Sequence, residues 1–335
     1  MEDIHLILKE LSCTGVKNGV LATIIHVEGS AYKKEGASML FKTDGTQVGM
    51  LSAGCLEEDL TARIDQQSLG EFPETIVYDM RGYSELSWGE GSGCNGVIHV
   101  LVQPLNKRLF QQMYEVKKLL NERKAVTWVQ PLSGGMDENS RFLTKNKDLD
   151  SFLSLKKDQR WSGVEFEPSM NQFIFVHHFN PKPRLFVFGA GKDAVPLVSF
   201  AARAGFSVVV CDWRPALCHK SRFPEADRLL HGFPEEMLPD IQFHPSDYVV
   251  ILTHNFQKDK EIVSHLIDKP LSYLGILGSA ARTKRLLGLK ELPNHITSPI
   301  GFSIGAKGPE EIAISVVAEL VSVKRFIETE EVVGS

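Results

Sequence analysis

Two glycines stand where the backbone could approach the phosphate groups of a nucleotide. Gly189 and Gly191 occur in R-L-F-V-F-G-A-G-K-D-A, directly after an apolar strand pattern and before a helical one, and Ala194 takes the third small position. In a G-x-G-x-x-G/A turn the first glycine makes the tight turn, the second admits a pyrophosphate, and the small third residue lets helix and strand pack. The helix N-terminus then faces the negative charge. This segment predicts a dinucleotide-binding turn.

An acidic residue extends the pattern. Asp212 ends S-V-V-V-C-D, about 20 residues beyond the glycines, where a carboxylate would accept hydrogen bonds from a ribose. Arg214, two positions later, could instead hold a 2′-phosphate, but the aspartate favours NAD over NADP. The alternative is a doubly wound sheet whose tight turn binds nothing. We favour nucleotide binding because strand, glycines, helix, strand and acid occur in the required order.

Three polar residues follow the next apolar strand pattern. Thr253, His254 and Asn255 come directly after D-Y-V-V-I-L, at the carboxyl end of a predicted strand. Doubly wound sheets bind ligands at these strand ends, so we expect Thr253 and His254 to lie in the cofactor site. A histidine in such a loop is more often a hydrogen-bonding residue than a catalyst, and we favour the former role for His254.

One cysteine stands at the start of a predicted helix. Cys55 lies in S-A-G-C-L-E-E, between a hairpin and a helical pattern. The positive end of a helix dipole stabilises a thiolate, which is a soft metal ligand and a carrier of sulfur. The alternative is a small buried residue, since free cysteine is among the most buried residue types. We favour the functional role for Cys55.

A second cysteine lies in a glycine-rich loop. Cys94 occurs in W-G-E-G-S-G-C-N-G, where backbone N–H groups could hold the oxygens of an anionic ligand. The two cysteines are not part of any C-x-x-C pair, so a structural zinc site is not expected. Ser30, Lys33 and Lys34 form another loop that could meet a phosphate, although a solvated lysine pair is an equal alternative. The remaining cysteines are assigned to packing: Cys13, Cys211 and Cys218.

Composition bounds the class of protein. The chain has 335 residues, 43% of them hydrophobic and 24% charged, with a net charge of -5. This length suits two domains, and the negative balance excludes sequence-independent binding to nucleic acid. Five scattered cysteines do not suggest disulfides and fit a reducing cytoplasm. The first residues lack the pattern of a signal peptide, and the most apolar late stretch, 312–323, is too short to span a membrane.

The chain divides at N-P-K-P-R, 180–184, where two prolines favour an extended link. We expect residues 1–180 to form a mixed α/β domain and residues 184–328 a Rossmann-like domain. Continuous apolar strand patterns alternate with helices in the second domain, which indicates a doubly wound parallel sheet. The main elements expected in the first domain are a strand at 19–27, a hairpin turning at Asp44 and Gly45, helices at 57–69 and 106–122, and a strand at 173–179.

Long segments in both halves resemble the xanthine dehydrogenase accessory factor family, of the XdhC/CoxI type. The resemblance covers nearly the whole chain and is specific because its motifs are long and ordered. In the first half it rests on the segments 28–40, 44–58 and 91–96, which include E-G-S-A-Y-K-K-E-G and L-S-A-G-C-L-E-E. In the second half it rests on 222–228, 253–259, 277–286 and 298–313, which include T-H-N-F-Q-K-D and S-P-I-G-F-S-I-G-A-K-G-P-E-E.

The resemblance implies a protein that binds molybdenum cofactor, takes part in its sulfuration with a cysteine desulfurase, and passes it to a xanthine dehydrogenase-type molybdenum hydroxylase. It also implies a homodimer. Cys55 would then be the molybdenum ligand or sulfur acceptor, while Cys94 and Ser30 would contact the cofactor. We expect a chaperone and not an enzyme, with NAD as an accessory ligand. The alternative is an NAD-dependent oxidoreductase using His254 as acid or base, which has no evident use for the two loop cysteines.

Overall fold

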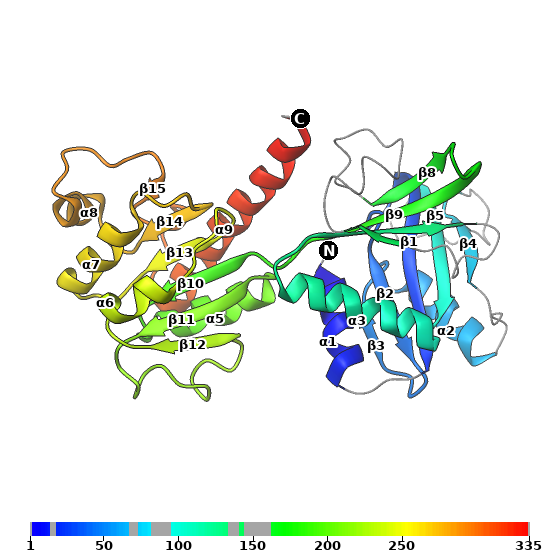
Figure 1. Ribbon diagram of the computed structural model, residues 1–335, viewed down its shortest axis with the longest axis horizontal. Helices are drawn as coiled ribbons and strands as arrows, with labels where there is room; N and C mark the ends of the chain where they lie inside the picture. Colours follow the sequence, from blue (N-terminus) through cyan, green and yellow to red (C-terminus); the bar gives the residue numbers. More distant parts are fainter. Residues whose placement is uncertain are drawn as a thin grey trace. The chain divides into compact units, whose positions relative to one another are not determined.

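The structure is a computed structural model that describes residues 2–13, 18–66, 73–81, 95–132, 141–143 and 162–333. Its chain divides into two compact units, residues 1–181 and 182–335 (Figure 1). In the described residues the N-terminal unit has two sheets and the C-terminal unit has one, and each unit has its own hydrophobic cores.

The N-terminal unit is built on antiparallel strands. Its described residues form one sheet in the order β3-β2-β1-β5-β4 and a second in the order β7-β6-β9-β8. The elements are α1 (Glu2–Cys13), β1 (Gly19–Ser30), β2 (Ser38–Lys42), β3 (Gln47–Gly49), α2 (Cys55–Asp65), β4 (Glu74–Asp79), β5 (Asn95–Pro104), α3 (Lys107–Asn121), β6 (Val126–Pro131), β7 (Arg141–Leu143), β8 (Gly163–Glu167) and β9 (Gln172–Phe179).

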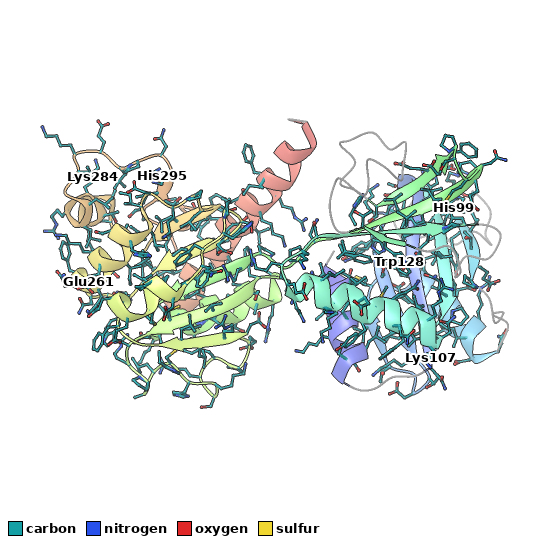
Figure 2. The ribbon with its side chains drawn as sticks, in the orientation of Figure 1. His99, Lys107, Trp128, Glu261, Lys284 and His295 are labelled. Atoms are coloured by element: carbon teal, nitrogen blue, oxygen red, sulfur yellow. The ribbon has the colours of Figure 1, made fainter. Side chains whose placement is uncertain are left out.

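Helices cover both faces of the first sheet. On one face, α1 and α3 pack through buried apolar residues against β1, β2, β6 and β9, with Trp128 of β6 at 2% exposure in this core (Figure 2). On the other face, Leu56 and Leu60 of α2 pack against Ala22, Ile24 and neighbouring strands. The alternation of side chains along β1 therefore sends apolar residues to two separate cores, as expected for a strand covered on both sides.

The C-terminal unit is built on a parallel sheet. Its described strands follow the order β12-β11-β10-β13-β14-β15. The elements are β10 (Arg184–Phe188), α5 (Ala194–Arg203), β11 (Ser207–Asp212), β12 (Arg228–His231), α6 (Pro234–Met237), the 3-10 helix η1 (Leu238–Asp240), β13 (Tyr248–Ile251), α7 (Phe256–Leu266), β14 (Tyr273–Ile276), α8 (Ala280–Leu287), β15 (Ile296–Thr297) and α9 (Gly308–Val333).

Strand β10 shows why this sheet is buried on both faces. Leu185 and Val187 point into the core formed with α5 and α9, whereas Phe186 and Phe188 point into the core formed with α6, α7 and α8. All four side chains are at most 2% exposed. A continuous apolar strand of this kind is stable only between two helical layers. Figure 1 shows those layers around β10 and β13.

The predicted fold class is confirmed: a Rossmann-like parallel sheet in the C-terminal half and a mixed α/β N-terminal half. The hairpin at Asp44 and Gly45 also forms, between β2 and β3. The helix expected from Glu57 begins two residues earlier, at Cys55, directly after Gly54. Within the described residues, no helix has both the length and the apolar character required to cross a membrane.

Gly189 directly follows β10 and lies close to the end of β13, so we expect a larger residue there to destabilise the fold. Its φ is +117°, and a Cβ there would lie 2.6 Å from the carbonyl oxygen of Leu252. We expect Gly189→Ala to lower the free energy of unfolding by about 3 kcal/mol or more, because backbone strain and overpacking add. Chemical denaturation measures this loss.

Gly288 is the matched control. It also has a positive φ, +67°, but a Cβ there would meet nothing within 4 Å. Gly288→Ala should therefore cost only the backbone strain, about 1 kcal/mol. Equal losses for the two variants would show that the contact with Leu252 contributes nothing.

Candidate functional site

The site begins at the point where the strand order of the parallel sheet reverses. Strands β10 and β13 pair directly, β11 and β12 continue on one side, and β14 and β15 continue on the other. The connections leaving β10 and β13 therefore run in opposite directions, and open α/β sheets bind ligands outside the carboxyl ends of such a pair of strands. Residues 189–193 and 253–255 occupy these strand ends, so the structure brings the predicted glycine turn beside the predicted Thr253 and His254.

The two glycines of the turn have different constraints. Gly189 must be glycine for the fold itself, because of its contact with Leu252 and its positive φ. A Cβ on Gly191 would lie 2.6 Å from Oδ1 of Asp193, the far end of a side chain, and would meet no other atom closer than 3.8 Å. A Cβ on Gly191 would therefore displace a flexible side chain and would not meet the packed core.

A histidine and an aspartate meet at these strand ends. Asp193 caps α5 by accepting the backbone N–H of Ala194 at 3.1 Å, and its other oxygen lies 2.6 Å from Nε2 of His254. The His254 side chain is 63% exposed and its backbone is left-handed, with φ of +58°. A non-glycine residue in this conformation is uncommon and is often functional. The contact engages Nε2 of His254, and among the described residues Nδ1 has no hydrogen-bond partner.

A buried network holds the His254 loop. The hydroxyl of Thr253 donates to Oδ1 of Asp259 at 2.5 Å and accepts the backbone N–H of Asn255 at 3.1 Å. Asp259 is 1% exposed, and its other oxygen accepts Nη2 of Arg282 at 2.5 Å. Thr253 thus positions the loop by joining β13 to α7 and α8, and its hydroxyl is engaged within the protein.

Asp212 lies at the end of β11 with its carboxylate fully hydrogen-bonded. Oδ1 accepts the backbone N–H of Arg214 at 2.8 Å and its Nε at 2.9 Å. Oδ2 accepts the backbone N–H of Ala190 at 2.6 Å and Nη2 of Arg214 at 2.7 Å. Burial alone would raise the pKa of Asp212, but hydrogen bonds from Arg214 and Ala190 outweigh it and lower the pKa.

These residues fit one part of a dinucleotide and not another. The turn at Gly189 and Gly191, followed by α5, is suited to phosphate oxygens. The ribose does not fit in the same way, because a carboxylate offers about four acceptor positions and Asp212 uses four for its own chain. The carboxylate of Asp193 also places negative charge at the start of α5.

In the N-terminal unit, Cys55 is the first residue of α2 and is half-buried. Its Sγ lies 3.7 Å from Oγ of Ser52, which also accepts the backbone N–H groups of Gly54 and Leu56 at 3.2 Å. Glu57 is 8% exposed and accepts the N–H groups of Leu51 and Ser52. The thiol therefore lies on a loop that hydrogen bonds within the loop and to Glu57 hold in place.

The other predicted residues of this unit have separate surroundings. The hydroxyl of Ser30 accepts the backbone N–H of Asn95 at 3.3 Å. Lys33 forms an ion pair with Asp3 at 2.9 Å, which favours the surface interpretation of this lysine. Cys94 lies outside the described residues. Where the structure is described, no group of three or more His, Cys, Asp or Glu side chains is placed to hold a metal ion.

The two cysteines assigned to packing in the C-terminal unit are buried. Cys211 is 1% exposed and Cys218 is 0% exposed. Burial raises the pKa of both thiols, to about 11 for Cys218. Neither thiol is suited to act as a thiolate at neutral pH.

Comparison with known proteins identifies the family. Residues 16–78 match the XdhC and CoxI family, and residues 185–320 match the XdhC Rossmann domain. A protein of Bacillus subtilis (strain 168), described as a probable subunit of xanthine dehydrogenase, is 46% identical over 333 residues, which cover 98% of this chain and 99% of that protein. The chain belongs to the XdhC and CoxI family. The resemblance that the sequence motifs indicated is confirmed.

Two further relatives extend the comparison. The "Molybdenum cofactor insertion chaperone PaoD" of Escherichia coli (strain K12) is 25% identical to this XdhC-family chain over 324 residues, covering 92% of this chain and 84% of PaoD. A crystal structure described as a xanthine dehydrogenase from Bacillus halodurans has a TM-score of 0.83 and 44% identity, covering 97% of this chain and 96% of that one.

Sequence reasoning missed the partners that fix the site. Asp193 could have been noticed, because aspartate directly before a helix is a typical N-cap. Its pairing with His254, 61 positions away along the chain, carries no local signal. The same holds for Asp259 and Arg282, whose side chains meet beneath the Thr253 loop.

Because the pKa of Asp212 is lowered on folding, we expect its contribution to the free energy of unfolding to depend on pH. Asp212→Asn removes the charge that four donors surround, and we expect it to lower the free energy of unfolding by about 2 kcal/mol at pH 7. Folding lowers the pKa of this carboxylate, so its ionised form stabilises the fold. This stabilisation is complete above the unfolded pKa of about 3.9 and is lost as the pH falls through the pKa of the folded state. The difference between wild type and variant should therefore shrink below about pH 4.

Denaturation curves between pH 7 and pH 3 measure that difference. Asp268→Asn, at an exposed aspartate just beyond α7, is the control and should leave stability nearly unchanged at each pH. A loss for Asp212→Asn that stays constant down to pH 3 would contradict the assignment of a stabilising ionised carboxylate.

Proposed function

We propose that this protein is an accessory factor that binds molybdenum cofactor and delivers it to a xanthine dehydrogenase-type molybdenum hydroxylase. The observation that carries the proposal is kinship over nearly the whole chain with two proteins, one described as a probable subunit of xanthine dehydrogenase and the other named as a molybdenum cofactor insertion chaperone. The shared length includes both units, so the comparison supports a common role for the whole chain and not for a single domain.

The surroundings of Cys55 support the N-terminal unit as the place where the cofactor is held. Gly54 has a φ of +127°, and a Cβ there would meet nothing within 4 Å, so the backbone beside the thiol borders open space. Cys55 adds a soft sulfur ligand at the positive end of α2. The buried Glu57 and the hydroxyl of Ser52 keep this loop in one conformation. A preorganised thiol binds a ligand with less loss of entropy than a mobile one.

The Rossmann unit would contribute a second ligand. We propose that the turn at Gly189 and Gly191 holds a nucleotide through its phosphates, next to the loop of His254, as a structural or regulatory ligand. The protein would work as a homodimer in the cytoplasm, and a cysteine desulfurase would be a further partner that supplies sulfur to the bound cofactor. The nucleotide role rests on the glycine motif, the homodimer and the cysteine desulfurase on the family resemblance, and the cytoplasmic location on the scattered cysteines.

A second candidate function is an NAD-dependent oxidoreductase. The observation that favours it is the 2.6 Å contact between Asp193 and His254, because a carboxylate that orients an exposed imidazole is a common arrangement for proton transfer. In that case His254→Gln would abolish turnover and Cys55→Ser would leave it unchanged. Molybdenum and pterin analysis of the purified protein separates the two functions.

The role of Cys55 is the main test of the proposal. Cys55→Ser keeps the size of the side chain and removes the soft ligand, so the variant should fold normally and hold at least tenfold less molybdenum cofactor. The protein is purified anaerobically from a host that makes the cofactor, and bound molybdenum and pterin are quantified. Transfer to an apo molybdenum hydroxylase should fall in parallel.

Cys13→Ser, in the same unit, is the control and should carry and transfer cofactor like the wild type. Thermal melting of both variants separates a loss of ligand from a loss of fold. Normal cofactor content in Cys55→Ser would exclude the thiolate role. Absence of cofactor from the wild-type protein would overturn the proposed function itself.

A further inference from the structure

The end of β11 does not offer the hydrogen-bond acceptors that a free ribose needs. The carboxylate of Asp212 has 0% side-chain exposure, and each of its oxygens already accepts two N–H groups from Ala190 or Arg214. A 2′,3′-diol binds such a site by donating its hydroxyl protons to the carboxylate. For that to happen, Arg214 would have to leave Asp212, which would leave a buried charge partly unpaired.

Arg214 presents hydrogen-bond donors at the same place. Its side chain is 37% exposed, and its guanidinium lies 4.5 Å from the ring centroid of Trp213. Nε and Nη2 are directed at Asp212, while Nη1 has no acceptor among the described residues. The guanidinium carries five N–H groups in a rigid plane, so donors remain for a ligand. The stacking on Trp213 and the bonds to Asp212 hold this plane before any ligand arrives.

The subsite therefore offers hydrogen-bond donors where an NAD site offers acceptors. We propose that the end of β11 receives a phosphomonoester through Arg214, so that the Rossmann unit prefers a nucleotide with a ribose 2′-phosphate, of the NADP(H) type, over NAD(H). This inference rests on the proposed nucleotide role of the glycine turn. In the sequence, Asp212 alone favours NAD, because the pairing of its carboxylate with Arg214 cannot be read from the chain. The inference from the structure replaces that preference.

The charges are consistent with this assignment. Asp212 is neutralised by Arg214 and by the backbone dipole at Ala190, so its negative charge does not act unopposed on an incoming phosphate. Phosphate oxygens can bind the free N–H groups of Arg214 without breaking any bond to Asp212. Binding a diol breaks such bonds, whereas binding a phosphomonoester adds new ones, and this difference is the source of the predicted selectivity.

The test uses calorimetric titration of the full chain with four probes. NADPH and NADH compare complete dinucleotides, and adenosine 2′-phosphate and adenosine 5′-phosphate compare the position of the phosphomonoester alone. We expect NADPH to bind at least tenfold more tightly than NADH, and adenosine 2′-phosphate to bind more tightly than its 5′ isomer. Competition by inorganic phosphate shows whether a phosphate group without a nucleoside fills the subsite.

Two substitutions at Arg214 separate charge from fold. Arg214→Gln should lose the preference for NADPH and bind NADH as well as or better than the wild type, because Asp212 is released to accept hydroxyl groups. Arg214→Lys keeps the charge and should retain part of the preference. Arg203→Gln is the matched control, since Arg203 is 73% exposed at the end of α5 and pairs only weakly with Glu225. Thermal melting confirms that each variant is folded.

The outcomes are distinct. Tighter binding of NADH by the wild type, or an unchanged preference in Arg214→Gln, overturns the inference and leaves the proposed nucleotide role standing. No binding of either dinucleotide or either adenosine phosphate overturns the inference together with that nucleotide role, while molybdenum cofactor loading remains a separate measurement. Binding of adenosine 2′-phosphate that inorganic phosphate displaces, without binding of NADPH, supports a phosphomonoester subsite whose ligand is not a dinucleotide.

Discussion

A carboxylate that is removed from water must be surrounded by hydrogen-bond donors, and the candidate site of this protein is built on that constraint. Asp212 meets it by binding the backbone of Ala190 in the glycine turn and the side chain of Arg214. The same bonds join the glycine turn to the end of β11 and set the direction in which the guanidinium faces. What the subsite can recognise follows from how the protein satisfies this one buried charge.

Other loops of the protein are held by the same kind of interaction. Asp259 joins Thr253 to Arg282 and thereby fixes the loop that carries the strained His254. Asp247 is 0% exposed and ties the start of β10 to the loop before β13 through Arg184 and the backbone of His244. Preorganisation of ligand-facing residues by buried partners is what allows a site to bind without a large entropic loss.

In the N-terminal unit, a buried carboxylate also holds the loop beside Cys55. Glu57 accepts the backbone N–H groups that precede α2, and Ser52 caps the turn in which Gly54 and Cys55 lie. Burial would raise the pKa of Glu57, but hydrogen bonds from the hydroxyl of Ser52 and from the backbone N–H groups outweigh it and lower the pKa, so the carboxylate stays charged and continues to hold the loop at neutral pH. In both units, therefore, the candidate ligand-facing residue stands next to a buried acid.

Much of this molecule is determined by local sequence. The apolar run of β10, its glycines and the helix that follows predict a Rossmann strand and turn, because burial on both faces and a positive φ each demand particular residue types. The long motifs of both halves were sufficient to indicate the XdhC and CoxI family. Cys55 was placed correctly at a helix start, since its flanking glycine and acidic residues are local signals.

Only the tertiary structure decided which side chains the candidate residues meet. The pair of Asp193 with His254 joins the ends of two strands, and the pair of Asp259 with Arg282 joins α7 to α8. No spacing along the chain encodes either pair. Asp212 is the clearest example. Its position in the sequence predicts an acceptor for a ribose, but the fold closes Ala190 and Arg214 around it and turns the subsite into a donor. Residue type and spacing determine which groups are present, whereas the hydrogen bonds that remain free for a ligand depend on contacts made after folding.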